Sequence, residues 1–544
     1  MTDAAGDERS FKGLGVSGGI VLGYAHVLGE QVCTRARGFS SVEEETRVFR
    51  AALGAAAAQI EALIAGEDKL AGDILEFQLA LLEDDDLLEP VFSRIAGGMA
   101  CDAAWAAVMD GEIAEYRRGG DDTLAERAAD LADLKARVLR VLGGAGAEGG
   151  PIRDRSILIA AELTPSAFLG LDWTRLAGVA TLGGSPTSHV AILARARGVN
   201  LMVGLDAPLD AFTNGTLLLL DPEQGILTLQ PDQDAMTKAM GRMAEAAKEG
   251  KSAHTLLRRA AVTADGQRVY VLANIDEPDL LGTLWPNICD GVGLARTEFL
   301  FQRSLPGEEE QFAFYYRLIG WAGGRPVTIR TLDAGGDKPV PGLTIDGEAN
   351  PFLGVRGMRL SLARPEIFRV QLRALLRAAA LGPLKVMVPM VTVPAELETV
   401  RAMMHAELAD LERAGAACAM PPLGMMVEVP AAALTAASFA ADFYSIGSND
   451  LIQYTMAAAR DNASLSPLAD PLNPAVLELI RRTVEAAHAR GVEVSLCGDM
   501  ASTPAYIGAL LDAGLTALSC APAQIGPVKL AISRYRPQSG VAPR

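Results

Sequence analysis

The chain has 544 residues, of which 50% are hydrophobic and 21% charged, and its formal net charge is −18. This length is more than one hydrophobic core serves, so we expect two or three domains. The excess of acidic residues argues against a nucleic-acid partner, because nucleic acids bind clusters of lysine and arginine. It fits a soluble enzyme that binds a partner protein with a basic face.

The beginning of the chain, MTDAAGDERSFKG, lacks the charged-then-apolar pattern of a secretion signal. No uninterrupted apolar run approaches the roughly 20 residues that span a bilayer. Six cysteines occur without a CxxC pair, so neither a zinc site nor a disulfide framework is indicated. We therefore expect a cytoplasmic protein without membrane insertion.

The spacing of apolar residues changes near Ser41, from a strand pattern to a helix pattern. The stretch FKGLGVSGGIVLGYAHVLGE joins glycine to β-branched and apolar residues and predicts one or two short strands. From Ser41 onward, apolar residues recur at spacings of three and four, and Pro90 is the only proline before Pro151, so helices are predicted. We expect a helical domain over residues 35–145, inserted into a small α/β domain made of residues 1–34 and 146–232.

Short apolar runs return after Pro151 and predict the remaining strands of that α/β domain: SILIAAEL, GVATLGG, NLMVG, GTLLLLD and GILTLQP. A helical pattern over residues 233–260 predicts a linker. From residue 261 to 544, about eight apolar runs alternate with helical patterns, which is typical of a parallel sheet covered on both faces. We predict a (β/α)8 barrel there, and hence a multidomain α/β fold.

The apolar runs of the predicted barrel end in residues that can do chemistry: Arg296, Arg330, Glu428, Asp450 and Cys497. In this fold the carboxyl ends of the strands build the active site. Arginines suit the oxygens of phosphate or carboxylate, with Arg356 or Arg460 as a third cation. Two carboxylates suit a hard divalent cation such as Mg2+, and Asn449 adds a neutral donor. The set predicts a small polyanion bound through a metal.

The stretch GGSPTSHVAILARARG, residues 183–198, places one of only five histidines where a glycine-rich loop becomes a helix. Neutral imidazole can take a phosphoryl group, and the N–H groups at a helix start offset the negative charge. Thr187 and Ser188 offer hydroxyls for capping or for phosphoryl oxygens. This setting suits a nucleophilic histidine that can carry a negatively charged group.

Six stretches, in order, are similar to successive motifs of Enzyme I of the phosphoenolpyruvate-dependent sugar phosphotransferase system: GVGLARTEFLF, TIRTLDAGGDK, NPFLGVRGMR, MVEVPAA, FYSIGSNDLIQYTMAAAR and LCGDMA. GGSPTSHVAILAR resembles the phosphohistidine motif of the same family, and the likeness covers nearly the whole chain. It implies transfer of phosphate from phosphoenolpyruvate to His189 and on to the phosphocarrier protein HPr, with release of pyruvate. It also implies a homodimer through the barrel, and a small α/β domain that carries the phosphohistidine and swivels between the barrel and the carrier protein.

The resemblance assigns a role to each barrel residue. It implies that phosphoenolpyruvate is bound by Arg296, Arg330 and Arg460, assisted by Arg356 and Asn449. Glu428 and Asp450 would hold Mg2+, and Cys497 would donate a proton to the enolate. Since the carrier of this family has a basic rim, the acidic clusters VEEE and LLEDDDLLE of the helical segment predict its docking surface.

This chain departs from the family pattern at three places. Ser185 and Pro186 fill a gap that usually holds one residue, Asp499 stands where glutamate is usual, and Ser448 stands where threonine is common. These changes bear on local geometry and leave the predicted reaction unaltered.

Three alternatives stay open from the residues alone. A phosphoenolpyruvate synthase or pyruvate phosphate dikinase shares the histidine domain and the barrel, but the chain offers neither a glycine-rich nucleotide loop nor room for a nucleotide domain. A metal-dependent lyase or aldolase would use the barrel and leave His189 without a task. A regulatory scaffold without turnover would not need the reactive residues named above.

Overall fold

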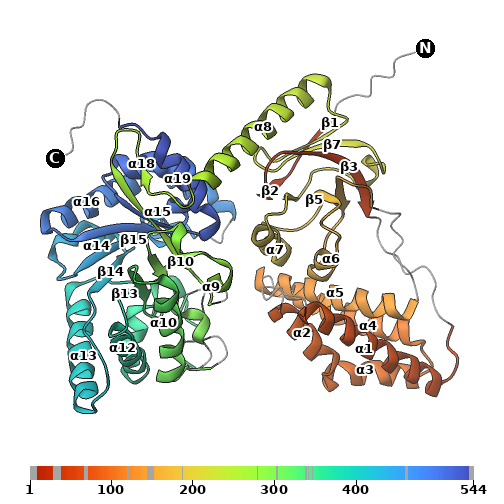
Figure 1. Ribbon diagram of the computed structural model, residues 1–544. Helices are drawn as coiled ribbons and strands as arrows, with labels where there is room; N and C mark the ends of the chain where they lie inside the picture. The colour runs from red at the N-terminus through yellow and green to blue at the C-terminus, as the bar shows by residue number, and fades with distance from the viewer. Residues whose placement is uncertain are drawn as a thin grey trace. The chain divides into compact units, whose positions relative to one another are not determined.

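The computed structural model forms two compact units, Met1–Ala246 and Ala247–Arg544 (Figure 1). The residues that it describes are 9–28, 38–65, 72–118, 122–143, 152–186, 188–278, 280–301, 304–336, 338, 340, 342–345, 347–459 and 463–537. Among them, no helix combines the length and the apolar character needed to cross a membrane.

The first unit is built on an eight-stranded sheet in the order β1-β8-β7-β3-β4-β5-β6-β2. Its strands are β1 (Arg9–Lys12), β2 (Leu14–Ser17), β3 (Val21–Leu28), β4 (Ser156–Ala160), β5 (Leu176–Thr181), β6 (Leu201–Val203), β7 (Leu217–Asp221) and β8 (Ile226–Leu229). Strands β3 to β6 run parallel, and the other pairings are antiparallel. Every strand predicted after Pro151 is present.

The chain has three strands before the helical segment, where the sequence predicted one or two. Strand β1 pairs with β8 at one edge of the sheet, whereas β2 pairs with β6 at the other. The chain changes edges at Gly13, where a Cβ atom would lie 2.9 Å from the side chain of Met202. This close approach favours glycine and divides what reads as one continuous strand.

Five helices interrupt the sheet between two neighbouring strands, β3 and β4, whose residues pair directly. They are α1 (Val42–Ala65), α2 (Gly72–Leu82), α3 (Asp85–Ala96), α4 (Cys101–Arg118) and α5 (Asp122–Gly143). Phe49 and Trp105 lie at the centre of their core, with ring centroids 5.7 Å apart. Because these helices leave and rejoin the sheet at adjacent strands, they are an insertion, as the sequence predicted.

Two short helices, α6 (Pro165–Leu169) and α7 (His189–Arg197), lie between the sheet and the inserted helices (Figure 1). Phe168 of α6 and Leu193 of α7 are buried in the same hydrophobic cluster as Leu134 of α5 and Leu158 of β4. The inserted helices therefore share one continuous core with the sheet, and the amino end of α7 faces α5.

The second unit is a closed barrel of eight parallel strands, in which β17 pairs with β10 to complete the ring. The strands are β10 (Arg268–Ile275), β11 (Val292–Ala295), β12 (Val327–Arg330), β13 (Leu384–Val388), β14 (Leu423–Val427), β15 (Phe443–Gly447), β16 (Glu493–Cys497) and β17 (Ala517–Cys520). A two-residue strand, β9 (Ala261–Val262), adds antiparallel to β10. The predicted (β/α)8 barrel is confirmed, with each of its eight apolar runs in a strand.

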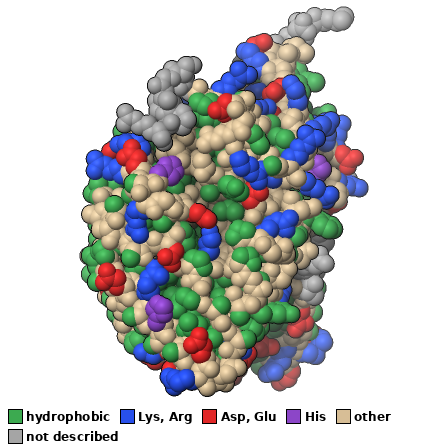
Figure 2. Space-filling model, turned by 60° about the vertical axis from the view of Figure 1, so that its left-hand side comes forward, with side chains coloured by type: hydrophobic (Ala, Val, Ile, Leu, Met, Phe, Trp, Pro, Cys, Tyr) green, Lys and Arg blue, Asp and Glu red, His purple; other side chains and the backbone are tan. Residues whose placement is uncertain are grey.

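The helices that follow the strands cover the outside of the barrel. They are α9 (Leu280–Thr283), α10 (Glu308–Ala322), α11 (Met358–Ala363), α12 (Pro365–Ala379), α13 (Pro394–Arg413), α14 (Pro430–Leu434), α15 (Ser448–Met456), α16 (Pro474–Arg490), α17 (Asp499–Ser502), α18 (Ile507–Asp512) and α19 (Ile525–Arg534). Helix α12 shows the pattern that makes this possible, because Leu372, Leu375 and Leu376 are all fully buried against the strands. On the face drawn in Figure 2, charged side chains of both signs lie among apolar ones.

Helix α8 (Gln233–Leu256) precedes the barrel, and a buried lysine ties the segment after it to the barrel. Lys529 of α19 is 4% exposed, and its Nζ donates to the carbonyl oxygens of Leu257 at 2.6 Å, Arg259 at 2.8 Å and Ile288 at 2.7 Å. Burial lowers the pKa of this lysine. Three carbonyl partners nevertheless satisfy all three donors of the ammonium group.

We predict that Lys529→Met lowers the free energy of unfolding of the barrel unit by about 2–4 kcal/mol, because three carbonyl oxygens lose their shared donor. The measurement is a denaturant titration read by hydrogen exchange of barrel peptides. The control is Lys251→Met, which removes an exposed lysine of α8 and should change stability by less than about 0.5 kcal/mol. Equal transition midpoints for the two variants would contradict the anchoring role.

Candidate functional site

The barrel residues singled out in the sequence lie at the same end of the barrel. Arg330 and Cys497 are the last residues of β12 and β16. Arg296 and Glu428 directly follow β11 and β14, and Asp450 lies in the first turn of α15, after β15. Because all eight strands are parallel, their carboxyl ends meet at one mouth of the barrel.

Arg356 is fully buried at this mouth between two carboxylates. Its Nε and Nη2 atoms donate to the two carboxylate oxygens of Asp333, each at 3.1 Å. Its Nη1 and Nη2 atoms donate to the oxygens of Asp450 at 3.1 and 3.2 Å. Burial acts to lower the pKa of the guanidinium, but the two carboxylates outweigh it and raise that pKa. Arg356 thus fixes the plane of Asp450.

Arg330 is also buried, and it shares Asp333 with Arg356. Its Nη2 donates to Glu298 at 2.7 Å, and its Nη1 lies 3.3 Å from the carboxylate of Asp333. The same carboxylate accepts a hydrogen bond from the Nζ of Lys338 at 3.2 Å. Burial acts to raise the pKa of Asp333, yet these cations hold it well below its usual range. Asp333 is therefore an ionised carboxylate at the centre of the cation cluster.

Sequence reasoning missed Asp333 and Glu298. The signal for Asp333 lies in TIRTLDAGGDK, where it follows Arg330 by three residues at the end of the same strand. Glu298 lies three residues beyond the end of β11, and its carboxylate accepts from both Arg330 and the backbone N–H of Asp333. Each holds an arginine in place, a task that only the assembled barrel reveals.

Glu428 is 1% exposed, and its Oε1 accepts from the backbone N–H of Met390 at 2.5 Å. Met390 has a φ of +57°, a left-handed conformation that is uncommon outside glycine. Burial, together with the negative charges of Asp450 and Asp333, raises the pKa of Glu428 to about 8. Two buried carboxylates that repel each other form an environment that a bound cation relieves.

The chemistry of these two carboxylates fits a hard divalent cation. Among the residues that the structure describes, no group of three or more His, Cys, Asp or Glu side chains is arranged to hold a metal. A zinc site requires such a set, whereas Mg2+ binds through one or two carboxylates and completes its shell with water and substrate oxygens. Glu428 and Asp450 are oxygen ligands of the kind that could hold a hard divalent cation.

Ser448 and Asp499, which differ from the residues usual in the family, both make direct contacts at the barrel mouth. Asn449 and Asp499 pair reciprocally: the Nδ2 of Asn449 donates to the carboxylate at 3.2 Å, and its Oδ1 accepts from the backbone N–H of Asp499 at 2.9 Å. The Oγ of Ser448 donates to the carbonyl of Cys497 at 3.0 Å. Gly498 between these groups has a φ of +100°, and a Cβ there would lie 2.3 Å from the Ser448 Oγ. The shorter aspartate thus still fixes Asn449.

Cys497 is 2% exposed and packs against Leu294 and Met426 inside the barrel. Its Sγ accepts from the hydroxyl of Ser445 and lies 3.6 Å from the carbonyl oxygen of Ile446. Burial raises the pKa of this thiol. The sulfur therefore keeps its proton at neutral pH.

Arg296 differs from the buried arginines because it is partly exposed and holds one ion pair, with Asp276 at 3.0 Å. The structure thus brings Arg356 into direct contact with Asp450, links Arg330 to this pair through Asp333, and leaves Arg296 partly exposed. Arg460 lies outside the described residues.

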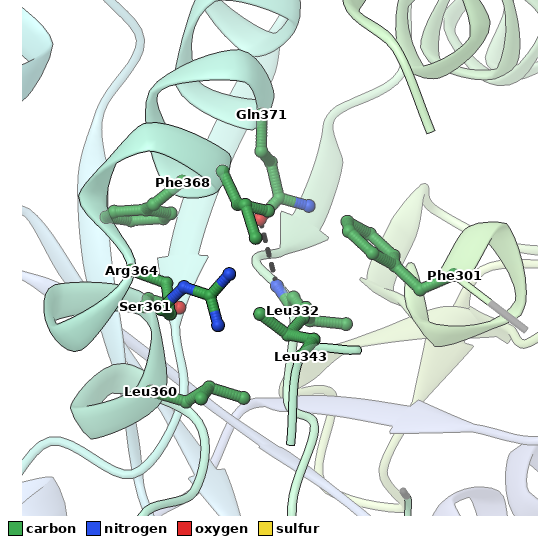
Figure 3. A pocket seen from close by; sticks show the side chains of 9 residues that line it. Phe301, Leu332, Leu343, Leu360, Ser361, Arg364, Phe368 and Gln371 are labelled. Atoms are coloured by element: carbon green, nitrogen blue, oxygen red, sulfur yellow. Dashed lines mark hydrogen bonds between the residues drawn. The ribbon is translucent and has the colours of Figure 1, made fainter. Parts of the chain in front are cut away.

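A small pocket lies among Phe301, Leu332, Leu343, Leu360, Ser361, Arg364, Ile367, Phe368 and Gln371 (Figure 3). The Oε1 of Gln371 accepts from the backbone N–H of Leu332 at 3.0 Å. Arg364 is the one charged side chain among these lining residues, and its Nε is engaged by Glu366. The pocket is a packing region beneath the loop after β12.

His189, in the first unit, begins helix α7. Ser188 is the N-cap, and its Oγ accepts from the backbone N–H of Ala191 at 3.4 Å. The side chain of Arg195 donates to the carbonyl of Pro186 at 2.8 Å, and the N–H of Ser188 donates to the carbonyl of Ser185 at 3.1 Å. Thr187 lies outside the described residues.

The imidazole of His189 is 28% exposed, and its Nδ1 lies 3.6 Å from Oδ1 of Asp130 in α5. Sequence reasoning missed Asp130 because it lies 59 positions earlier, in a helix whose pattern predicts packing alone.

Three family models match the chain in series. The PEP-utilising enzyme N-terminal model covers residues 12–127, the mobile domain model covers residues 152–225, and the PEP-binding domain model covers residues 250–536. Among solved structures, the chain resembles an NMR solution structure of Enzyme I (nEIt), with 28% identity over 43% of this chain and 99% of that one and a TM-score of 0.37.

Curated relatives align over nearly the whole chain. Those from Bacillus sp. (strain S) and Geobacillus stearothermophilus are each 37% identical, over 96% and 97% of this chain and 92% and 93% of their own lengths. A relative from Bacillus subtilis (strain 168) is 36% identical, over 97% of this chain and 95% of its own. All three are named phosphoenolpyruvate-protein phosphotransferase. The chain belongs to the phosphoenolpyruvate-protein phosphotransferase family, that of Enzyme I.

Proposed function

We propose that this chain transfers the phosphoryl group of phosphoenolpyruvate to His189 and then to a histidine of the carrier protein HPr, with release of pyruvate. The observation that carries the proposal is the cluster of buried arginines and carboxylates at the barrel mouth. The same chain presents a partly exposed histidine at a helix start. Family membership supports the same reaction.

The arginines suit the two anionic ends of phosphoenolpyruvate. Arg356 is held by four hydrogen bonds to Asp333 and Asp450 and a fifth to the hydroxyl of Tyr454, so its position does not depend on the ligand. Arg330 is likewise fixed by Glu298 and Asp333, whereas Arg296 at the rim can exchange its ion pair for a ligand oxygen. We assign the phosphate and carboxylate oxygens of the substrate to Arg296, Arg330 and Arg460, with Arg356 and Asn449 assisting.

Glu428 and Asp450 would hold Mg2+. When bound, the cation offsets the negative charge of the phosphoryl and carboxylate oxygens. Arg356 orients Asp450 through its paired hydrogen bonds, and the backbone N–H of Met390 orients Glu428. Pre-set ligands of this kind reduce the reorganisation that binding requires.

The chain's own groups then divide two tasks. A ring nitrogen of His189 attacks phosphorus, while the arginines stabilise the charge that develops on the phosphoryl oxygens. The enolate of pyruvate that remains needs a proton on its terminal carbon. Cys497 is the proposed donor, because its buried thiol stays protonated at neutral pH, where a carboxyl group of ordinary pKa would be ionised.

The predicted division of the chain completes the proposal. Residues 1–34 and 146–232 would carry the phosphohistidine, residues 35–145 would dock HPr, and residues 233–260 would link them to the barrel of residues 261–544. We further propose a homodimer through the barrel. A cytoplasmic location is in keeping with the free state of the five cysteines that the structure describes.

For His189→Ala we predict complete loss of acid-labile phosphate on the protein after incubation with labelled phosphoenolpyruvate and Mg2+, because the acceptor nitrogen is gone. His405→Ala, which removes an exposed histidine of α13, is the control and should be labelled like the parent. Labelling of the His189 variant at normal stoichiometry would place the acceptor elsewhere.

Asp450→Asn should lower Mg2+-dependent consumption of phosphoenolpyruvate by at least about 100-fold, since one of two charged ligands is lost. The assay follows initial rates over a series of Mg2+ concentrations. Asp442→Asn serves as the control, because Asp442 lies at the opposite end of β15 and accepts from Leu423 at 2.7 Å. A parental rate and metal requirement in the Asp450 variant would exclude the two-carboxylate site.

Cys497→Ala should still pass phosphate to His189 but should protonate the enolate slowly and without facial preference. The measurement is deuterium incorporation into pyruvate in heavy water, read for its stereochemistry. Cys289→Ala provides the control, as it removes another buried thiol, one that precedes β11. If the Cys497 variant protonates stereospecifically at the parental rate, the thiol is a packing residue.

A further inference from the structure

Asp130 of α5 is a buried carboxylate that faces the imidazole of His189. It is 1% exposed, and its Oδ1 lies 3.6 Å from the Nδ1 of His189. Neither of its carboxylate oxygens has a hydrogen-bond partner among the residues that the structure describes. A buried carboxylate without hydrogen bonds costs several kcal/mol, so a partner that can donate to it has a large effect.

Asp133, one turn further along α5, shows that packing accounts for one buried aspartate of this helix but not for the other. Asp133 accepts from the hydroxyl of Ser166 at 2.6 Å, from the backbone N–H of Ser166 at 3.4 Å and from Gln78 at 3.1 Å. These bonds join α5 to α6 and α2. Among the described residues, the carboxylate of Asp130 has no comparable set of hydrogen bonds, and it lies close to the imidazole of His189.

We propose that Asp130 is a positioning residue for the phosphoryl acceptor, an inference that rests on the proposed function of His189. The carboxylate accepts the Nδ1–H of the ring, which fixes the neutral imidazole as the Nδ1–H tautomer. Nε2, on the other side of the ring, then carries the lone pair. The present separation exceeds a hydrogen bond by about 0.5 Å, a distance that a small side-chain rotation closes.

The charge of Asp130 also matters in the transfer step. The lone pair of Nε2 forms the N–P bond while the bond between phosphorus and the enol oxygen breaks, and that electron pair leaves with the enolate of pyruvate. The Nδ1 proton stays in place, so the ring gains positive charge. A buried carboxylate beside Nδ1 stabilises this charge, as the aspartate does for the histidine of a serine hydrolase. The inserted helices thereby take part in the chemistry.

The first test requires no substitution. Nitrogen chemical shifts of the two ring atoms of His189, measured in the full chain at alkaline pH where the ring is neutral, report the tautomer directly. We expect the Nδ1–H form to predominate. A predominant Nε2–H form would overturn the proposal, because Asp130 would then face a nitrogen without a proton.

The second test compares Asp130→Asn with Asp133→Asn, a matched change on the same helix. We expect Asp130→Asn to lose the tautomer preference and to slow phosphorylation of His189 at least about 10-fold, with Asp133→Asn close to the parent in both. Equal effects in the two variants would assign Asp130 to packing alone. Label found on a residue other than His189 would refute the proposed function, whereas label on His189 at the parental rate in Asp130→Asn would refute only the positioning role.

Discussion

The barrel mouth depends on the double fork in which the guanidinium of Arg356 bridges Asp333 and Asp450. One fully buried cation satisfies two carboxylates at distances of 3.1 and 3.2 Å. Removing any member would leave an unpaired buried charge, which is far more costly than the net contribution of the intact pair. The fork also joins the loop after β12 to the first turn of α15, so it sets the spacing between the predicted cation-binding and substrate-binding groups.

The rest of the cluster follows from this constraint. Asp333 is shared with Arg330, whose other partner is Glu298, and the charges of Asp450 and Asp333 raise the pKa of Glu428. Positive and negative side chains therefore alternate across the mouth, and no group can move without altering the electrostatics of the next. Such a network suits a polyanion that arrives with a cation, because both kinds of charge find partners that are already oriented.

The two units differ in how far their reactive side chains are buried and held by hydrogen bonds. Arg330, Arg356 and the carboxylates that they contact are mostly buried and held by several bonds, whereas His189 is partly exposed at the start of α7, near the buried carboxylate of Asp130. A fixed cluster suits binding and charge stabilisation. An exposed edge suits a group that must meet more than one partner. Membership in the phosphoenolpyruvate-protein phosphotransferase family is consistent with this division of tasks.

The sequence by itself determined the (β/α)8 barrel, the helical insertion and the family, because apolar periodicity and short motifs are local properties of the chain. It also indicated which residues end the barrel strands, from Arg296 to Cys497, since strand ends can be read from the pattern. Only the tertiary structure decided which of these touch: Arg356 contacts Asp450, 94 positions away, and Arg296 stays at the rim. Glu298, Asp333 and Asp130 acquire their roles from neighbours that are distant in sequence or unremarkable in pattern, and side-chain contacts of that kind arise only when separate elements pack together.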